Sequence, residues 1–123
     1  MFKVIFYKDS KGNEPVREYL IKLKARSSTS KQDRIQFTKI SAYIRSLQEY
    51  GTRIGNPTVK HIDGDIWELR PLSDRIFFFY WKDETFVLLH YFHKKTQKTP
   101  QKEIDKAKHN MSDFIERTCQ NEY

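Results

Sequence analysis

A chain of 123 residues is long enough for one domain with a modest core and too short for two ordinary domains. Its formal net charge of +7 at pH 7 favours a polyanionic partner, either nucleic acid or an acidic protein, although solubility alone would also explain it. The lone Cys119 cannot form an internal disulfide, and no apolar run is long enough for a signal peptide or a membrane span, so we expect a cytoplasmic protein.

The first half of the chain predicts one strand and two helices. Residues 2–7 are rich in Phe, Val, Ile and Tyr, which favour a strand, and Asn13 is placed to cap a first helix. Ser30 and Asp33 can cap a second helix, which Gly51 would end. Each helix has one apolar side, formed by Val16, Tyr19, Leu20 and Leu23 in the first and by Phe37, Ile40, Ile44 and Leu47 in the second. The short polar connector between them predicts an antiparallel hairpin.

The second half predicts a meander of strands followed by a helix. The expected strands cover residues 58–62, 65–72, 75–82 and 85–92. After a lysine-rich loop, Thr99 is placed to cap the last helix, with Pro100 in its first position. We expect the tail, residues 119–123, to be frayed.

Alternation along the strands determines which side chains share a face of the sheet. If residues 73–74 form a two-residue turn, Leu72 pairs with Arg75 and Arg70 with Phe77. Any turn of even length keeps one charged set on the same face: Glu68, Arg70, Arg75 and Phe77. The opposite face then carries Trp67, Leu69, Ile76, Phe78 and Tyr80.

A two-residue turn before the last strand would align that strand in the same way. Arg75 would then face Phe92, and Phe77 would face His90. Continuing the alternation adds Lys94 to the charged face. A single odd turn or bulge would change this arrangement.

Charged side chains among apolar ones on one sheet face predict a site for phosphates. Arg70 and Arg75 can hold phosphate oxygens bidentately, and Phe92 could offer a surface on which an unpaired base stacks. The alternative is a cross-strand ion pair between Glu68 and one of the arginines on an exposed face, worth at most about 1 kcal/mol. The sequence pattern leaves both interpretations open.

The run 93–99, HKKTQKT, brings cations to the N-terminus of the last helix, where free amide groups favour anions. The run could bind phosphate or be a solvated loop. His93, at the end of the strand, is the better histidine candidate for proton transfer. The histidines and the single cysteine show no metal-ligand spacing, so we expect neither a metal nor another cofactor.

The segment DIWELRP, a short turn, DRIFFFYW and then FVLLHYFHKKTQKTPQKEIDKA resembles the HigB-type branch of the RelE/ParE toxin superfamily. The resemblance is most specific from Trp67 to Ala107 and, through the order of the preceding elements, covers nearly the whole chain. It implies an α+β fold, with an antiparallel twisted sheet packed against an N-terminal helical hairpin and a C-terminal helix, in a single domain over residues 1–123.

The resemblance also implies a function and a partner. It implies a ribosome-dependent endoribonuclease that cuts mRNA in the ribosomal A site. It further implies a helix-turn-helix, HigA-like antitoxin that silences the toxin in a toxin–antitoxin hetero-oligomer, with no membrane involved.

Several residues match positions of the family's site. Arg75 matches the phosphate-binding arginine of RelE-like toxins, and Arg70 falls where those enzymes often have a second basic residue. Lys94 and Lys95 take the place of basic residues that follow the last strand. RelE-like enzymes commonly have a lysine where this chain has Glu68, so the identity of the general base stays open.

The implied reaction needs no metal: a ribose 2′-OH loses its proton and attacks the adjacent phosphate, and an acid protonates the leaving 5′-oxygen. Glu68 is the candidate base and His93 the reserve acid. The two arginines form the phosphate clamp, and one of the two lysines is the cation that stabilises the transition state. Further RNA contacts are expected from Phe92, Lys98 and Lys60.

Two other functions remain possible: a ParE-like inhibitor of DNA gyrase, which binds and does not cut, and a nucleic-acid-binding module without catalysis. An antitoxin is expected on the outer faces of the first two helices, because their basic residues suit an acidic partner. These residues are Arg17, Lys22, Lys24, Arg34, Lys39 and Arg45.

Overall fold

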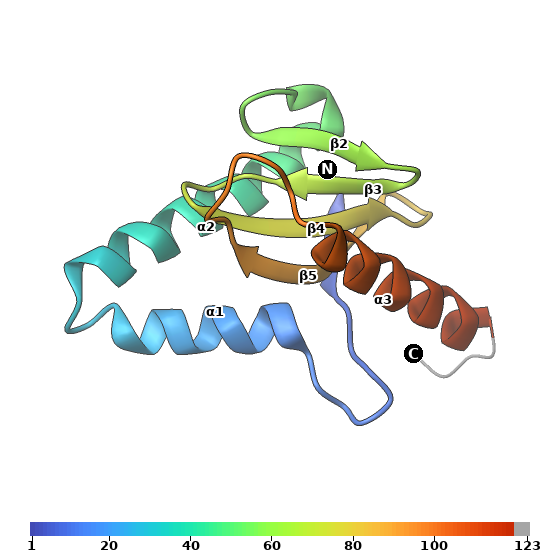
Figure 1. The fold of residues 1–123 in the computed structure, drawn as a ribbon, viewed down its shortest axis with the longest axis horizontal. Coiled ribbons are helices and arrows are strands. Elements are labelled where there is room, and N and C mark those ends of the chain that lie inside the picture. The colour runs from blue at the N-terminus through green and yellow to red at the C-terminus, as the bar shows by residue number, and fades with distance from the viewer. Residues whose placement is uncertain (120–123) are drawn as a thin grey trace.

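A computed structural model describes residues 1–119 (Figure 1). The helices are α1 (Pro15–Arg26), α2 (Lys31–Tyr50) and α3 (Gln101–Cys119), with a short 3-10 helix η1 (Gly51–Ile54) after α2. The strands are β1 (Lys3–Phe6), β2 (Val59–Asp63), β3 (Ile66–Leu69), β4 (Asp74–Tyr80) and β5 (Thr85–His93). They form one sheet in the order β1-β5-β4-β3-β2, so the predicted α+β fold is confirmed.

The sheet differs from the prediction at one edge. β2 to β5 form the expected antiparallel meander, but β1 pairs with β5 in parallel. The chain leaves β1, passes through the helical hairpin and returns through the meander, so β1 and β5 run in the same direction side by side. The sheet is therefore mixed, not purely antiparallel.

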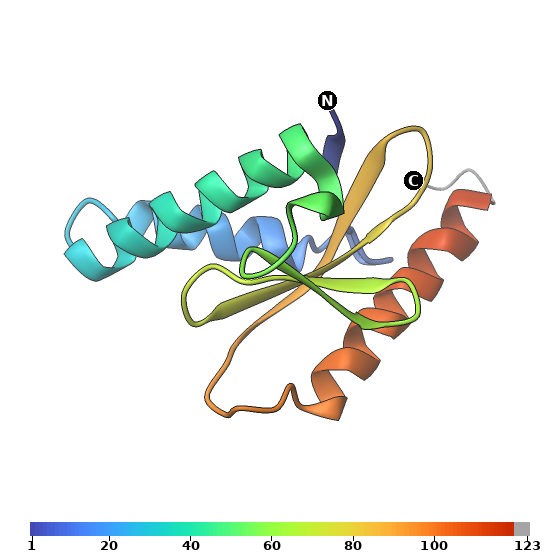
Figure 2. The same ribbon diagram turned by 90° about the horizontal axis from the view of Figure 1, so that it is seen from above.

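Helices cover both faces of the sheet (Figure 2). The hairpin of α1 and α2 packs on one face through Val16, Leu23, Ile40 and Leu47, which meet sheet residues such as Phe78. On the other face, α3 packs through Ile104, Ala107 and Phe114 against a set that includes Phe77, Phe79, Val87, Leu89 and Phe92. None of the helices in the described part of the chain is long and apolar enough to cross a membrane.

Helix ends follow the sequence signals in part. Ser30 caps α2 as predicted, because its hydroxyl oxygen accepts the Asp33 N–H, and Gly51 ends α2 with φ +66°. The cap predicted at Asn13 is wrong: Glu14 occupies that position, and the Asn13 N–H donates to the Asp9 carboxylate instead. Cys119 belongs to α3, and the rest of the tail predicted to fray, residues 120–123, lies outside the described residues.

The loop between β3 and β4 is longer than predicted. It spans residues 70–73, because Pro71 cannot donate to the ladder and Leu72 adopts φ +55°. Phe77 consequently faces Glu68, not Arg70. Four residues is still an even number, so the predicted division of side chains between the two faces is retained.

An odd turn and a bulge compensate for each other between β4 and β5. The Trp81 N–H donates to the Thr85 carbonyl, which makes the turn three residues long instead of two. The ladder then skips Leu89: Phe78 faces Leu88, whereas Phe77 faces His90. Each irregularity alone would reverse the faces, and together they restore the predicted pairing of Arg75 with Phe92.

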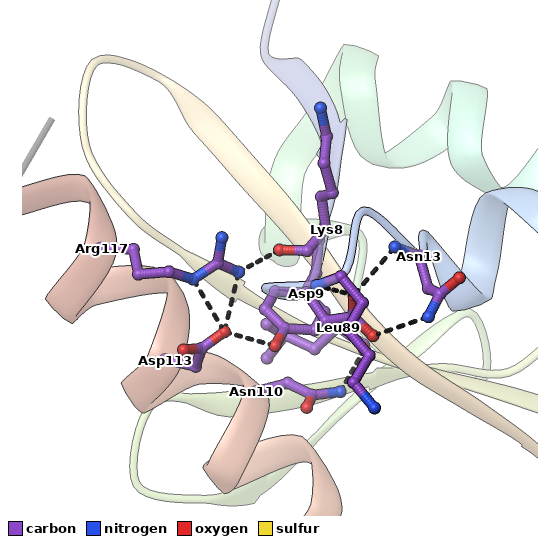
Figure 3. Close-up of polar contacts among 9 residues, drawn as sticks. Lys8, Asp9, Asn13, Leu89, Asn110, Asp113 and Arg117 are labelled. Carbon is purple, nitrogen blue, oxygen red and sulfur yellow. Dashed lines mark hydrogen bonds and ion pairs between the residues drawn. The ribbon is translucent and has the colours of Figure 1, made fainter. Parts of the chain in front are cut away.

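A polar network fastens α3 to the sheet and to the loop after β1 (Figure 3). The Tyr7 hydroxyl donates to Asp113 at 2.5 Å, and Arg117 donates to the same carboxylate at 2.8 Å and to the Lys8 carbonyl. The Asn110 amide donates at 2.9 Å to the carbonyl of Leu89, the bulged residue. These bonds fix the angle at which α3 crosses the sheet.

Candidate phosphate-binding cleft

A cleft of about 550 Å³ opens where the β3–β4 loop meets the segment that follows β5. Its lining side chains are Arg70, Leu72, Ser73, Arg75, Lys94, Lys95, Thr96 and Gln97. Four of these are cations and none is an acid, so the cleft is strongly electropositive. The sequence prediction that Arg70, Arg75 and Lys94 share one side of the sheet is confirmed.

Backbone geometry holds the two sides of the cleft together. Arg75 is the second residue of β4 and lies opposite Phe92 of β5. One residue beyond β5, the Lys94 N–H donates to the Ser73 carbonyl at 2.8 Å. Lys94 is thereby held beside Arg75, although the two residues are 19 positions apart in the sequence.

Glu68 lies beneath the cations and is fully buried. Its Oε1 is 3.4 Å from Arg70 Nε and 3.7 Å from Arg75 Nε. Burial raises the pKa of Glu68, and the neighbouring cations, Arg75 foremost, oppose that rise. Glu68 therefore neutralises part of the local charge from below and does not itself line the cleft.

The hydrogen bonding around this carboxylate is incomplete. Within the described residues, Glu68 Oε1, Arg70 Nε and Arg75 Nε are buried and make no hydrogen bond, since the ion-pair distances exceed good hydrogen-bond geometry. Both arginines are also held from elsewhere: Arg70 Nη1 donates to the side-chain oxygen of Asn56 at 3.4 Å, and Arg75 Nη1 donates to the carbonyls of Leu72 at 2.7 Å and Asp74 at 2.8 Å. Buried polar atoms without hydrogen bonds are rare in folded proteins. Here they lie beneath the cleft, where two guanidinium groups face one carboxylate oxygen at ion-pair distance.

The cations of the cleft are also partly desolvated. Burial lowers the pKa of Arg75 and that of Lys94, while the charge of Glu68 opposes both shifts. A cation whose pKa is lowered by burial gains more from an anionic ligand than one in open water. This applies to Lys94, whose ammonium lies against the cleft.

A second polar cluster lies on the opposite face of the sheet, directly behind Arg75. Asp74 is 3% exposed and accepts hydrogen bonds from the Tyr19 hydroxyl of α1, from Gln36 Nε2 of α2 at 2.8 Å and from His93 Nδ1 at 3.1 Å, with the histidine tautomer assigned from this contact. Burial, followed by the bond to Asp74, raises the pKa of Tyr19. We call these four residues the Asp74 cluster.

The Asp74 cluster connects the helical hairpin to the cleft. Gln36 also donates to the carbonyl of Pro71 at 3.3 Å, and the carbonyl of Asp74 accepts from Arg75. The loop that carries Arg70 is thus attached to α2, and the start of β4, which carries Arg75, is attached to both helices. The sequence analysis missed this cluster, because it assigned Asp74 to a turn, and partners 38 and 55 residues distant leave no local signal.

Two predicted site residues lie elsewhere. Phe92 is 8% exposed and packs against Phe77 beneath α3, so the expectation that a base could stack on it is wrong: the ring belongs to the core. His93 projects from the face that carries Asp74 and does not line the cleft, although 61% of its side chain is exposed.

The remaining predicted residues fall into two groups. Lys60 faces Glu68 across β2 and β3 and so extends the basic face, whereas Lys98 is exposed in the loop before α3 and does not line the cleft. The residues predicted to meet an antitoxin, Arg17, Lys24, Arg34 and Arg45, are all exposed on α1 and α2.

The structure is an α+β protein with a mixed five-stranded sheet, consistent with a RelE-like fold, and carries a basic cleft on one sheet face. The chain belongs to the family described as Phage derived protein Gp49-like (DUF891), which it matches over residues 27–112. This family is associated with the toxins of toxin–antitoxin systems. The matched region runs from the end of α1 into α3 and includes the whole cleft. A search of curated proteins found no match to the chain.

Proposed function

We propose that this protein is the toxin of a type II toxin–antitoxin system and a HigB-type endoribonuclease that cuts mRNA on the ribosome. The observation that carries the proposal is the cleft in which Arg70, Arg75 and Lys94 converge above a buried carboxylate, with four cations and no acid in its lining. A phosphodiester would supply the negative charge that this lining lacks. Membership of a toxin-associated family supports the same conclusion.

In the proposed reaction, a ribose 2′-oxygen loses its proton and forms a bond to the adjacent phosphorus. The bond from phosphorus to the 5′-oxygen breaks, and that oxygen gains a proton, which leaves a 2′,3′-cyclic phosphate and a 5′-hydroxyl. Arg70 and Arg75 would hold the non-bridging oxygens, and Lys94 or Lys95 would stabilise the additional negative charge of the transition state. Removing one such donor typically costs about 10²–10³ in rate.

The two candidate proton-transfer groups, Glu68 and His93, both lie outside the lining of the cleft. Glu68 is the acid–base residue nearest the arginines, but its burial favours a positioning role, in which it orients both guanidinium groups from below. His93 lies on the opposite face, held by Asp74.

The test is expression of the chain without any partner, with RNA and DNA examined in the same cells. Primer extension should reveal new 5′ ends within translated regions as growth stops. A ParE-like gyrase inhibitor would instead stop growth with intact mRNA and altered DNA supercoiling. A binding module without catalysis would leave both unchanged.

We further propose that the physiological partner is a HigA-like helix-turn-helix antitoxin bound to the hairpin of α1 and α2. This hairpin is exposed and basic along its outer side, where Arg17, Lys24, Arg34 and Arg45 are all exposed to an acidic partner. A partner there would keep the toxin out of the ribosome by its bulk and leave the cleft partly open. A map of the complex in which the antitoxin fills the cleft and avoids the hairpin would refute this arrangement.

A further inference from the structure

The outer side of α2 carries an apolar stripe. Ile35 is 50% exposed, and Thr38 and Ala42 follow it at intervals of three and four residues. These side chains form the floor of a shallow hollow of about 340 Å³ whose surface is almost wholly carbon, with Arg34 and Lys39 at its rim. We call these five residues the α2 seam.

The two cations stand on opposite sides of the stripe. At 3.6 residues per turn, Arg34 and Lys39 are about 140° apart around the helix, with the three apolar positions between them. Each is held away from the stripe: Arg34 Nε donates to the Ser27 carbonyl at 3.2 Å, and the Lys39 ammonium lies 5.4 Å from the centre of the Tyr43 ring. The apolar floor therefore stays open between two fixed positive charges.

We propose that the α2 seam is the docking site of an amphipathic helix of the antitoxin, with acidic residues on both sides of that helix's apolar stripe. Apolar positions alternating at three and four residues are the pattern by which two helices pack side by side. The small side chains of Thr38 and Ala42 allow the partner's backbone to approach closely. Arg34 and Lys39 occupy the flanking positions that select the charge of a partner helix.

Charge argues against other occupants of the seam. A second copy of this chain packed through the same stripe would bring Arg34 and Lys39 against like charges, which disfavours pairing. RNA would place charged phosphates over an apolar floor. An acidic amphipathic helix is the occupant that satisfies both the floor and the rim.

The seam also lies close to the cleft. Gln36, the neighbour of Ile35 in the sequence, points to the other side of α2 and donates to Asp74 and to the Pro71 carbonyl. A helix on the seam would therefore lie about one helix diameter, roughly 10 Å, from the loop that carries the arginines. That distance fits inhibition by bulk beside an open cleft.

The experiment uses the full-length chain and the protein encoded by the adjoining reading frame, since the proposal rests on the proposed toxin function for the identity of its partner. Binding is measured by calorimetry for the parent chain, for Ile35→Asp and for Ala42→Glu. The control is Ile115→Asp, because Ile115 is an exposed isoleucine on α3. We expect each seam variant to weaken binding at least about 30-fold, as for an interface hot spot, and the control to change it by about twofold at most.

A charge-reversed pair, Arg34→Glu with Lys39→Glu, tests the rim. It should weaken binding by up to about tenfold, and replacing acidic residues of the partner helix with lysine should restore it. Unchanged binding by the seam variants, or no binding of the adjoining product to the parent, would overturn the proposal. A self-association that Ile35→Asp abolishes in sedimentation would assign the seam to a second copy and overturn it as well.

RNA cleavage on ribosomes, measured for the same variants without the partner, separates this proposal from the proposed function. Ile35 and Ala42 are outside the cleft, so cleavage should equal that of the parent. If the seam variants keep both cleavage and antitoxin binding, the docking proposal is refuted and the proposed function is not. If the parent does not cleave RNA, the proposed function is refuted, whether or not the seam variants change antitoxin binding.

Discussion

Two charged clusters lie against the same face of the sheet, and they differ in how completely they are bonded. Around Asp113, the hydroxyl of Tyr7 and the guanidinium of Arg117 donate at 2.5 to 3.1 Å (Figure 3). Around Glu68, the nearest guanidinium nitrogens are 3.4 and 3.7 Å away. The Asp113 carboxylate is closely hydrogen-bonded within the chain, whereas Glu68 holds its two arginines only at ion-pair distance, and both arginines line a cleft that an external anion can enter.

The pKa values of the two carboxyl groups shift in opposite directions. Hydrogen bonds from Arg117 and Tyr7 lower the pKa of Asp113, so this group adds stability above its unfolded pKa, and the stability is lost as pH falls through the lower folded value. Burial raises the pKa of Glu68, so ionising Glu68 in the fold costs stability as pH rises through the raised value. Ionised Asp113 thus stabilises the folded state, whereas ionised Glu68 lowers its stability while holding the two arginines in place.

The largest effect is expected when the cleft loses its central cation. Arg75→Ala should reduce ribosome-dependent cleavage by about 10²–10³, because one donor to the transition-state phosphate is removed. Arg53→Ala, which removes an exposed arginine of η1 outside the cleft, is the control and should cleave like the parent. The measurement is single-turnover cleavage of a programmed mRNA, with circular dichroism to verify folding. Equal rates for Arg75→Ala and the parent would remove Arg75 from the site.

The opposite pattern is expected for the Asp113 cluster. Asp113→Ala should lower the free energy of unfolding by about 1–3 kcal/mol at pH 7, because Tyr7 and Arg117 lose a shared acceptor, while cleavage per folded molecule stays the same. Urea unfolding at pH 7 and near pH 3 measures this effect, which should shrink in acid, because the stability is lost as pH falls below the unfolded pKa toward the lowered pKa of Asp113. If Asp113→Ala lost cleavage and kept its stability, the Asp113 cluster would belong to the functional site and would not be a structural contact.

The charge of Glu68 should make anion binding dependent on pH. Sulfate, which stays a dianion throughout, should bind more tightly as pH falls through the raised pKa of Glu68, because protonation removes a negative charge beneath the cleft. The expected gain is several-fold, on the order of 1 kcal/mol. Glu68→Gln should abolish this dependence while every histidine is retained. An equally pH-dependent affinity in the Gln variant would mean that another group controls binding.

Local periodicity explains why much of the fold and half of the site could be predicted. Alternation alone predicts that Glu68, Arg70 and Arg75 lie on one face. The prediction is correct although the predicted turn is too short, because the predicted and the observed turn both contain an even number of residues. The predicted pairing of β4 with β5 is correct only because the prediction lacks two features of the structure whose effects cancel, the three-residue turn and the bulge at Leu89. Nothing in a strand pattern reveals that α3 would cover Phe92, because that depends on packing between distant segments.

The smallest effect tests whether the Asp74 cluster supports the cleft from behind. Tyr19→Phe removes one hydroxyl and keeps the ring, which stacks on Tyr91 with the ring centres 4.1 Å apart. Asp74 would still accept from Gln36 and His93, so the loss should be about 1 kcal/mol of unfolding free energy, or a few degrees in Tm.

Because Asp74 precedes Arg75 and its carbonyl accepts from that guanidinium, the weakened anchor should also slow cleavage, by about threefold. This loss should appear in kcat and leave KM for the programmed ribosome unchanged, since the cations of the cleft are all retained. Tyr50→Phe is the matched control, because Tyr50 is the last residue of α2, is 49% exposed and lies outside both the Asp74 cluster and the cleft. If Tyr19→Phe and Tyr50→Phe cleave and unfold alike, the hairpin does not position the arginines.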